Sequence, residues 1–147
     1  MPAETVEIES LVPHRWPMLL ISEIVSFDAR SASTRSVVAD HWPLVDGQSA
    51  NVMVLIELVA QTAAVNNGWE LRQREGAAAD NRGWIVGIKS ARFHLDVLTV
   101  GTTILVESTN QLEYDNFRVV HGIASIDGTV AAEVTLQLMQ AQPDSRT

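Results

Sequence analysis

The sequence predicts an α+β domain in which an antiparallel sheet of about six strands wraps around one long central helix. Residues 52–65 (VMVLIELVAQTAAV) form a nearly continuous apolar run, and the helix is expected to continue from there to about Arg74. The segments that follow the helix alternate apolar with polar residues, which is typical of strands with one buried face. Because the helix is apolar on nearly all sides, such a sheet must cover most of its surface.

Several short elements are predicted before the central helix. We expect, in order, a short helix at 5–12, strands at 19–27 and 31–39, and an irregular stretch at 40–51. Pro13 and Pro17 restrict the backbone of the loop between the first two of these elements. Ser49 or Asn51 is expected to cap the central helix, because their side chains accept hydrogen bonds from free backbone N–H groups.

The chain after the central helix, which is expected to end before Gly76, is predicted to be mostly extended. We expect a flexible connection at 76–82, followed by strands at 84–93, 102–113, 117–126 and 129–140. Asp127-Gly128 is a strong hairpin signal between the last two strands. The chain 1–147 is expected to be a single domain with a core at about 8–140 and a disordered tail at 141–147. Edge strands in so small a sheet also favour a homodimer.

Composition and charge exclude several classes of protein. The net charge of −8 opposes nonspecific binding to nucleic acid, which requires clustered basic residues. The sequence has no cysteine, so it forms neither disulfides nor thiolate metal sites. The longest apolar run, 52–65, is shorter than the roughly twenty residues that span a bilayer. The acidic N-terminus lacks the features of a secretory signal, so we expect a soluble cytoplasmic protein with no membrane partner.

Glu57 places a carboxylate inside the apolar helix. Gln61 lies one helical turn further on, so both side chains share one helix face. Burial favours the neutral form of a carboxyl group, which can then donate a proton near neutral pH. Glu57 is therefore a candidate general acid, and the structural alternative is that it reaches solvent or pairs with an arginine.

Two histidines are interpreted as structural residues that form hydrogen bonds. His94 follows the end of a predicted strand, and His121 interrupts the alternation of another. No two of the histidines in the sequence have the helical or close loop spacing that metal sites favour. We therefore expect no metal.

Three blocks of the sequence together resemble the hot-dog-fold 3-hydroxyacyl-[acyl carrier protein] dehydratases. They are LVPHRWPMLL at 11–20, IELVAQ at 56–61, and GIKSARF at 87–93 with Val97 and Gly101. Similar blocks in that family form the opening loop, the part of the central helix that carries the catalytic acid, and the strand and turn after it. Their order and spacing agree from about residue 8 to 140, so the resemblance implies a hot-dog fold.

The resemblance also implies the removal of water from a 3-hydroxyacyl thioester in fatty-acid or polyketide-like biosynthesis. A histidine removes the proton next to the thioester carbonyl, and Glu57 is the acid that helps to expel hydroxide from the 3-carbon. No metal or redox cofactor is implied, because the substrate is carried on the phosphopantetheine of acyl carrier protein or coenzyme A. Active sites of the family lie at a dimer interface, so a second subunit is implied, either identical or a homologous dehydratase.

The catalytic histidine is where the sequence departs from the family. Typical members carry it in a His-Phe-Pro-Gly motif fourteen residues before the glutamate, where this chain has Pro43. His41, in the sequence His-Trp-Pro, lies sixteen residues before Glu57 and is one candidate. His14 is the other and is favoured, because the similar dehydratases of aryl-polyene pathways keep the Pro-His-x-x-Pro-Met block and also lack the usual motif.

Further site residues follow from the same resemblance. Asn51 and Val52 are expected to offer backbone N–H groups to the thioester oxygen at the helix N-terminus. The other expected substrate contacts are Gln61, the loop residues Trp16 and Trp42, and Arg15, which would meet a phosphate or the carrier protein. Two alternatives remain open: a thioesterase of the same fold in which Glu57 orients water, and a noncatalytic subunit that partners an active homologue.

Overall fold

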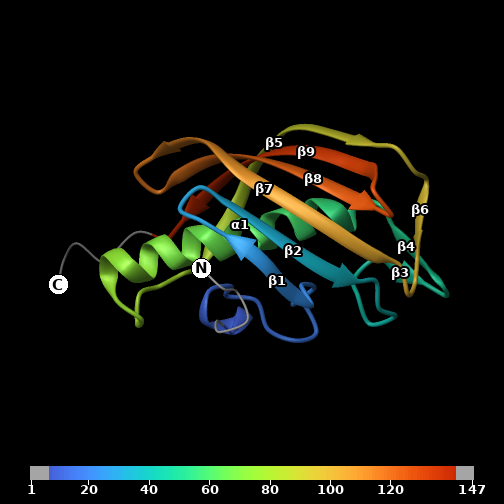
Figure 1. Cartoon of the computed structure of the whole chain (residues 1–147), viewed down its shortest axis with the longest axis horizontal. Helices are drawn as coiled ribbons and strands as arrows, with labels where there is room; N and C mark the ends of the chain where they lie inside the picture. Colours follow the sequence, from blue (N-terminus) through green and yellow to red (C-terminus); the bar gives the residue numbers. More distant parts are fainter. Residues whose placement is uncertain (1–6, 142–147) are drawn as a thin grey trace.

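The computed structural model describes residues 7–141, in which a large antiparallel sheet covers one long helix (Figure 1). The sheet has six strands in the order β1-β2-β7-β8-β9-β5. They are β1 (Glu23–Phe27), β2 (Ser31–Val37), β5 (Gly83–Phe93), β7 (Thr103–Tyr114), β8 (Phe117–Ile126) and β9 (Thr129–Gln140). The helix α1 (Val54–Glu75) runs along one face of this sheet. The arrangement confirms the predicted hot-dog fold.

Alternation along the strands decides which side chains pack on the helix. Buried residues of β9 lie opposite buried residues of β8 in three pairs, Ala132 with Ala124, Val134 with Gly122, and Leu136 with Val120. A side chain at Gly122 would collide with Val59 of α1, so this glycine lets helix and sheet approach closely. The core therefore lies between α1 and the sheet, where the burial of apolar side chains supplies most of the stabilising free energy.

The predicted hairpin and the predicted helix end are both confirmed. Asp127 and Gly128 have φ values of 50° and 78°, as a two-residue hairpin between β8 and β9 requires. Gly76 follows the helix with φ at 94°, and its N–H donates to the carbonyl of Arg72. A glycine adopts this backbone conformation without the strain that a side chain would bring.

The N-terminal elements are shorter than predicted. The short helix is reduced to the 3-10 turn η2 (Ile8–Ser10), and residues 5 and 6 lie outside the described part of the chain. Strand β1 begins at Glu23 rather than at residue 19. The reason is that the backbone of Met18 and of Leu20 bonds to the side chain of Gln61 instead of to a neighbouring strand.

A second, small sheet was not predicted. It consists of β3 (Val45–Asp46), β4 (Ser49–Asn51) and β6 (Val97–Thr99), in the order β3-β4-β6. The predicted helix cap was also wrong, because Ser49 and Asn51 lie in β4 and Met53 is the N-cap residue. Asn51 contributes in another way, since its Oδ1 accepts a hydrogen bond of 2.9 Å from the Met53 N–H. Most of the predicted tail, 142–147, lies outside the described residues.

Candidate active site

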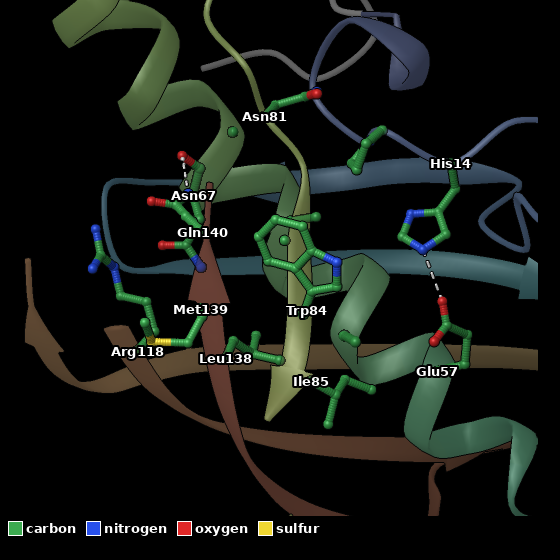
Figure 2. Close-up of a pocket in the computed structure, with 15 residues that line it drawn as sticks. His14, Glu57, Asn67, Asn81, Trp84, Ile85, Arg118, Leu138, Met139 and Gln140 are labelled. Carbon is green, nitrogen blue, oxygen red and sulfur yellow. Dashed lines mark hydrogen bonds and ion pairs between the residues drawn. The ribbon is translucent and has the colours of Figure 1, made fainter. Parts of the chain in front are cut away.

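The predicted acid lies beside a histidine of the same chain. Glu57 is on the first turn of α1, and His14 is in the loop that follows η2. The Nε2 atom of His14 is 2.9 Å from Oε1 of Glu57, and each side chain is 29% exposed (Figure 2). Two groups at this distance can exchange a proton directly, without a bridging water molecule.

Gln61 fixes both halves of this pair. It is fully buried, and its Nε2 donates to Oε1 of Glu57 at 3.1 Å and to the carbonyl of Met18 at 2.8 Å. Its Oε1 accepts a hydrogen bond of 2.9 Å from the N–H of Leu20. One amide therefore holds the carboxylate and the segment that continues from His14. These bonds explain why a polar side chain is stable in an apolar helix.

Arg15 stiffens the loop that carries His14. Its Nη1 donates to the carbonyls of Val12 and His14, both at 2.9 Å, and its Nη2 donates to the carbonyl of Glu9 at 3.1 Å. Hydrogen bonds from a charged donor are among the stronger ones in proteins. The predicted contact of Arg15 with a phosphate or a carrier protein would compete with these bonds, and it stays a prediction.

The two ring nitrogens of His14 have different surroundings. Nδ1 is buried and makes no hydrogen bond within residues 7–141, so Nε2 is the nitrogen that reaches an acid–base partner. One proton is shared in the contact with Glu57. Either the imidazole, neutral or protonated, donates its N–H to the carboxylate, or the carboxylic acid donates to the neutral imidazole. The site can therefore present a base and an acid side by side.

A channel of about 260 Å³ extends from this pair along the helix (Figure 2). Small residues of α1 leave room for it on the helix face that begins at Glu57, namely Ala60, Ala64 and Gly68. The opposite wall comes from β5 and β9, through Trp84, Ile85, Leu138 and Met139. The channel thus has mostly apolar walls and an acid–base pair at one end.

The lining becomes polar at the other end of the channel. Asn67, Arg118 and Gln140 lie there, away from the acid–base pair (Figure 2). Sequence reasoning missed these residues and Trp84. Two signals were present: Asn66-Asn67 interrupts an apolar helix, and Arg118 occupies an inward-facing position of β8.

The other predicted site residues lie outside the lining of the channel. Trp16 is largely exposed, and its ring centroid is 5.5 Å from that of His41. Trp42 is buried in the core, and the remaining predicted contacts, Arg15, Asn51, Val52 and Gln61, likewise do not line the channel. Of the two candidate bases, the structure brings His14 to Glu57 within one chain and places His41 against Trp16.

The remaining histidines have the structural partners that were expected. His94 Nε2 lies 3.1 Å from Glu133 Oε2, and His121 Nδ1 lies 2.9 Å from Thr135 Oγ1. Within residues 7–141, no three His, Cys, Asp or Glu side chains are grouped as a metal site requires. Over the same range no helix is both long and apolar enough to cross a membrane.

Together the fold, the histidine–glutamate pair and the adjoining channel define a hot-dog protein equipped for proton transfer. The model of the ApeP-like family, described as ApeP dehydratase, matches residues 6–147. The 3-hydroxyacyl-[acyl-carrier-protein] dehydratase FabZ of Latilactobacillus sakei is 32% identical over 139 residues, which cover 90% of this chain and 95% of that protein. FabZ of Ligilactobacillus salivarius is 31% identical, and the match covers 92% of this chain and 97% of that protein. The chain belongs to the ApeP-like dehydratase family.

Solved structures share the fold. The dehydratase heterocomplex ApeI:P from Xenorhabdus doucetiae matches with a TM-score of 0.84 at 21% identity, covering 96% of this chain and 93% of that chain. A hypothetical thioesterase with coenzyme A from Streptococcus pneumoniae matches with a TM-score of 0.61 at 14% identity, covering 84% of this chain and 88% of that chain. At these identities the likeness shows the hot-dog fold alone.

Proposed function

We propose that this chain removes water from 3-hydroxyacyl thioesters carried on acyl carrier protein or coenzyme A, and so forms 2-enoyl thioesters in fatty-acid or polyketide-like biosynthesis. The observation that carries the proposal is the contact of 2.9 Å between His14 and Glu57 at one end of an apolar channel. Membership of a dehydratase family and the relatives named as 3-hydroxyacyl-[acyl-carrier-protein] dehydratases support the same reaction.

The proposed reaction uses the two side chains in separate roles. Neutral Nε2 of His14 takes the proton from C2, and the electron pair of that C–H bond forms the double bond between C2 and C3. The C3–O bond breaks as the protonated carboxyl group of Glu57 gives its proton to the hydroxyl, which leaves as water. Turnover produces an imidazolium ion and a carboxylate. Because the two groups come within 2.9 Å of each other, one proton transfer restores both starting forms.

Negative charge that develops on the thioester oxygen requires an N–H donor, and the residues before α1 were expected to supply it. The Asn51 N–H donates to the carbonyl of Leu44 at 3.0 Å and is therefore occupied. Val52 is the stronger candidate of the two, because it lies at the positive end of the helix dipole and near the turn that carries Glu57.

The proposal is tested by incubating the protein with a 3-hydroxyacyl carrier protein and identifying the product by mass spectrometry. The wild type should form the enoyl thioester, and Glu57→Gln and His14→Ala should each lose about 10²- to 10⁴-fold in kcat. Full activity in both variants would contradict the assignment of Glu57 and His14 to the active site. Release of free acid and free thiol without an enoyl product would identify a thioesterase. A noncatalytic subunit would be inactive alone, and neither substitution would change the activity of its catalytic partner.

We also propose that the chain works as a dimer through β5. This strand is an edge of the six-stranded sheet, and Trp84, Val86 and Ile88 are 54%, 54% and 50% exposed. An edge strand with free backbone groups and apolar side chains favours pairing with another strand. A second hot-dog subunit, identical or homologous, would pair with β5 and cover the channel at Trp84. The dehydratase structure with the similar fold is itself a heterocomplex, so both kinds of dimer need testing.

The proposed partners are thus acyl carrier protein or acyl-coenzyme A as substrate, and a second subunit. No cofactor enters the proposed steps. The net charge of −8 would repel an acidic carrier protein, so docking would require a local basic surface. A cytoplasmic location stays a prediction.

A further inference from the structure

A second cavity of about 280 Å³ lies beside the channel. It is enclosed by the turn η2, the C-terminal end of α1 and the connection at 76–82. Gly68 and Asn81 line both cavities, so the second cavity adjoins the channel at these two residues (Figure 2). The wall is thin there, because Gly68 has no side chain and the Nδ2 of Asn81 makes a single hydrogen bond of 3.0 Å, to the carbonyl of Leu11.

Arg72 brings a positive charge without a partner into the second cavity. Within residues 7–141, the side chains of Arg72, Lys89 and Arg92 form no ion pair or hydrogen bond. Lys89 and Arg92 are exposed to water, but Arg72 is half-buried and lines the cavity. Charged side chains are rarely buried without a partner. The last turn of α1 suits a cation, yet no carbonyl in the described chain accepts a hydrogen bond from this guanidinium.

The other polar groups of the second cavity leave this charge in excess. Glu9 and Arg15 both line the cavity, and they balance each other, with 3.6 Å between Arg15 Nε and Glu9 Oε1. Asn81 has a second N–H on Nδ2, beyond the one that it donates to Leu11. A ligand with a negative charge would therefore meet a free guanidinium and a free amide donor, which together form charge-assisted hydrogen bonds.

The distance from the acid–base pair suits one part of the proposed substrate. Gly68 follows Glu57 by eleven residues, which is about 16 Å along the helix axis. Arg72 lies one turn further on, and its side chain leans back toward Gly68, because helical side chains point toward the N-terminus. In phosphopantetheine, about thirteen bonds join the sulfur to the phosphorus and span roughly 16 Å, at about 3.6 Å for every three bonds of an extended chain.

A thioester beside His14 and Glu57 can thus place its phosphate at the level of Arg72. Within the dehydratase function proposed for this chain, on which the inference rests, we propose that the second cavity binds the phosphate of the phosphopantetheine arm through Arg72 and Asn81. The resemblance implied such a contact for Arg15. The Nη1 and Nη2 atoms of Arg15 are occupied by backbone carbonyls, whereas the guanidinium of Arg72 is free.

Two thioesters that differ only in the phosphate test the inference. They are a 3-hydroxyacyl pantetheine and the 3-hydroxyacyl 4′-phosphopantetheine with the same acyl chain. The wild-type kcat/KM should favour the phosphorylated member by about tenfold, as expected for a hydrogen bond to a charged group. Equal kcat/KM for the two members would overturn the phosphate site and leave the dehydratase function intact.

Variants locate the preference in the structure. Arg72→Met should bring the ratio of the two kcat/KM values close to one, because kcat/KM falls for the phosphorylated member. Arg35→Met makes the same chemical change at an exposed position of β2, outside both cavities, and should keep the wild-type ratio. An unchanged ratio in Arg72→Met, shown by circular dichroism to be folded, would contradict the assignment.

The same phosphate reaches the protein from two sources. In acyl carrier protein it links the arm to a serine, and in coenzyme A it is part of a diphosphate. The wild-type kcat/KM with each 3-hydroxyacyl thioester identifies the preferred source, for which Arg72→Met should lower kcat/KM by about tenfold. No decrease with either source would contradict the phosphate site.

A binding measurement separates the phosphate site from the reaction. If none of these thioesters is dehydrated, the proposed function fails, and NMR titrations with free phosphopantetheine and free pantetheine measure the preference without turnover. Tighter binding of phosphopantetheine, reduced in Arg72→Met and kept in Arg35→Met, would support the site. Equal affinities, or no binding of either compound at millimolar concentration, would overturn it.

Discussion

The side-chain amide of Gln61 lies 3.1 Å from the carboxylate of Glu57, and it also holds the backbone that continues from His14. Both contacts reach the same oxygen of Glu57, Oε1: Gln61 donates a hydrogen bond to it, and Nε2 of His14 shares a proton with it. In this arrangement one helix supplies the candidate acid and, a turn later, the group that orients it.

Replacement of Gln61 by methionine, which has a similar length, should affect both stability and turnover. The variant leaves the N–H of Leu20 and the carbonyl of Met18 without their partner, so the free energy of unfolding should fall by about 1–3 kcal/mol. Glu57 and the loop of His14 lose their common support. We therefore expect kcat to fall, with a smaller relative change in KM. Urea unfolding and steady-state kinetics check this, with Gln73→Met, the same change at an exposed position of α1, as the control. Wild-type values of both quantities in Gln61→Met would contradict the positioning role.

Substitution of the two candidate bases should give unequal effects. His14→Ala removes the ring that contacts Glu57, and kcat should fall by about 10²- to 10⁴-fold. His41→Ala removes an exposed ring that packs on Trp16, and kcat should change by less than about tenfold. Initial rates with one carrier-protein substrate provide the comparison. The reverse order would show that His41, supplied from a second subunit, is the base.

Gly68→Ala should destabilise the protein even though it lies in a helix. At an exposed helix position this change stabilises by about 1 kcal/mol. At Gly68, however, the new methyl group would collide with the carbonyl oxygen of Leu11, at the start of the loop that carries His14. We expect the free energy of unfolding to fall by about 1–3 kcal/mol, measured by thermal denaturation. A gain in stability would show that the loop moves away at little cost.

Ile88→Lys should disrupt the proposed dimer. Ile88 is 50% exposed on the edge strand β5, and a charge there opposes strand pairing. Leu112→Lys is the matched control, because Leu112 is 52% exposed on β7, where it pairs with Val119 of β8 and is separated from β5 by two strands. Sedimentation velocity should show a smaller species for the Ile88 variant alone, or loss of copurification with a homologous subunit. Unchanged assembly in both variants would place the interface elsewhere.

The large strands could be predicted because their signals are local. Strands predicted at 117–126 and 129–140 agree with β8 and β9, since alternation and turn residues define both ends. The small sheet could not be predicted in this way. Its strands have two or three residues, too few for a periodic pattern, and the pairing of Asn51 with Val97 depends on the tertiary fold.

The candidate site was predictable only in part for a similar reason. Glu57 stands out because a carboxylate in an apolar helix is visible in the sequence. His14 and His41 both lie in loops next to a proline and a tryptophan, so the residues alone do not separate them. The two histidines are separated by the packing of the His14 loop on Gln61, which only the structure shows. Arg118 lies far from Asn67 in the sequence, and only the folded sheet brings both to one end of the channel.

The open edge of the sheet has a consequence for the life of the protein in a cell. Strand β5 is eleven residues long and exposes large apolar side chains from Trp84 to Ile88, so in the proposed dimer a newly made chain would have to meet its partner before this edge meets an unrelated one. If the partner is a homologous subunit, the scarcer of the two chains would set how much of the other survives in soluble form. Balanced synthesis of both chains, rather than strong expression of either, would then determine the yield of active enzyme.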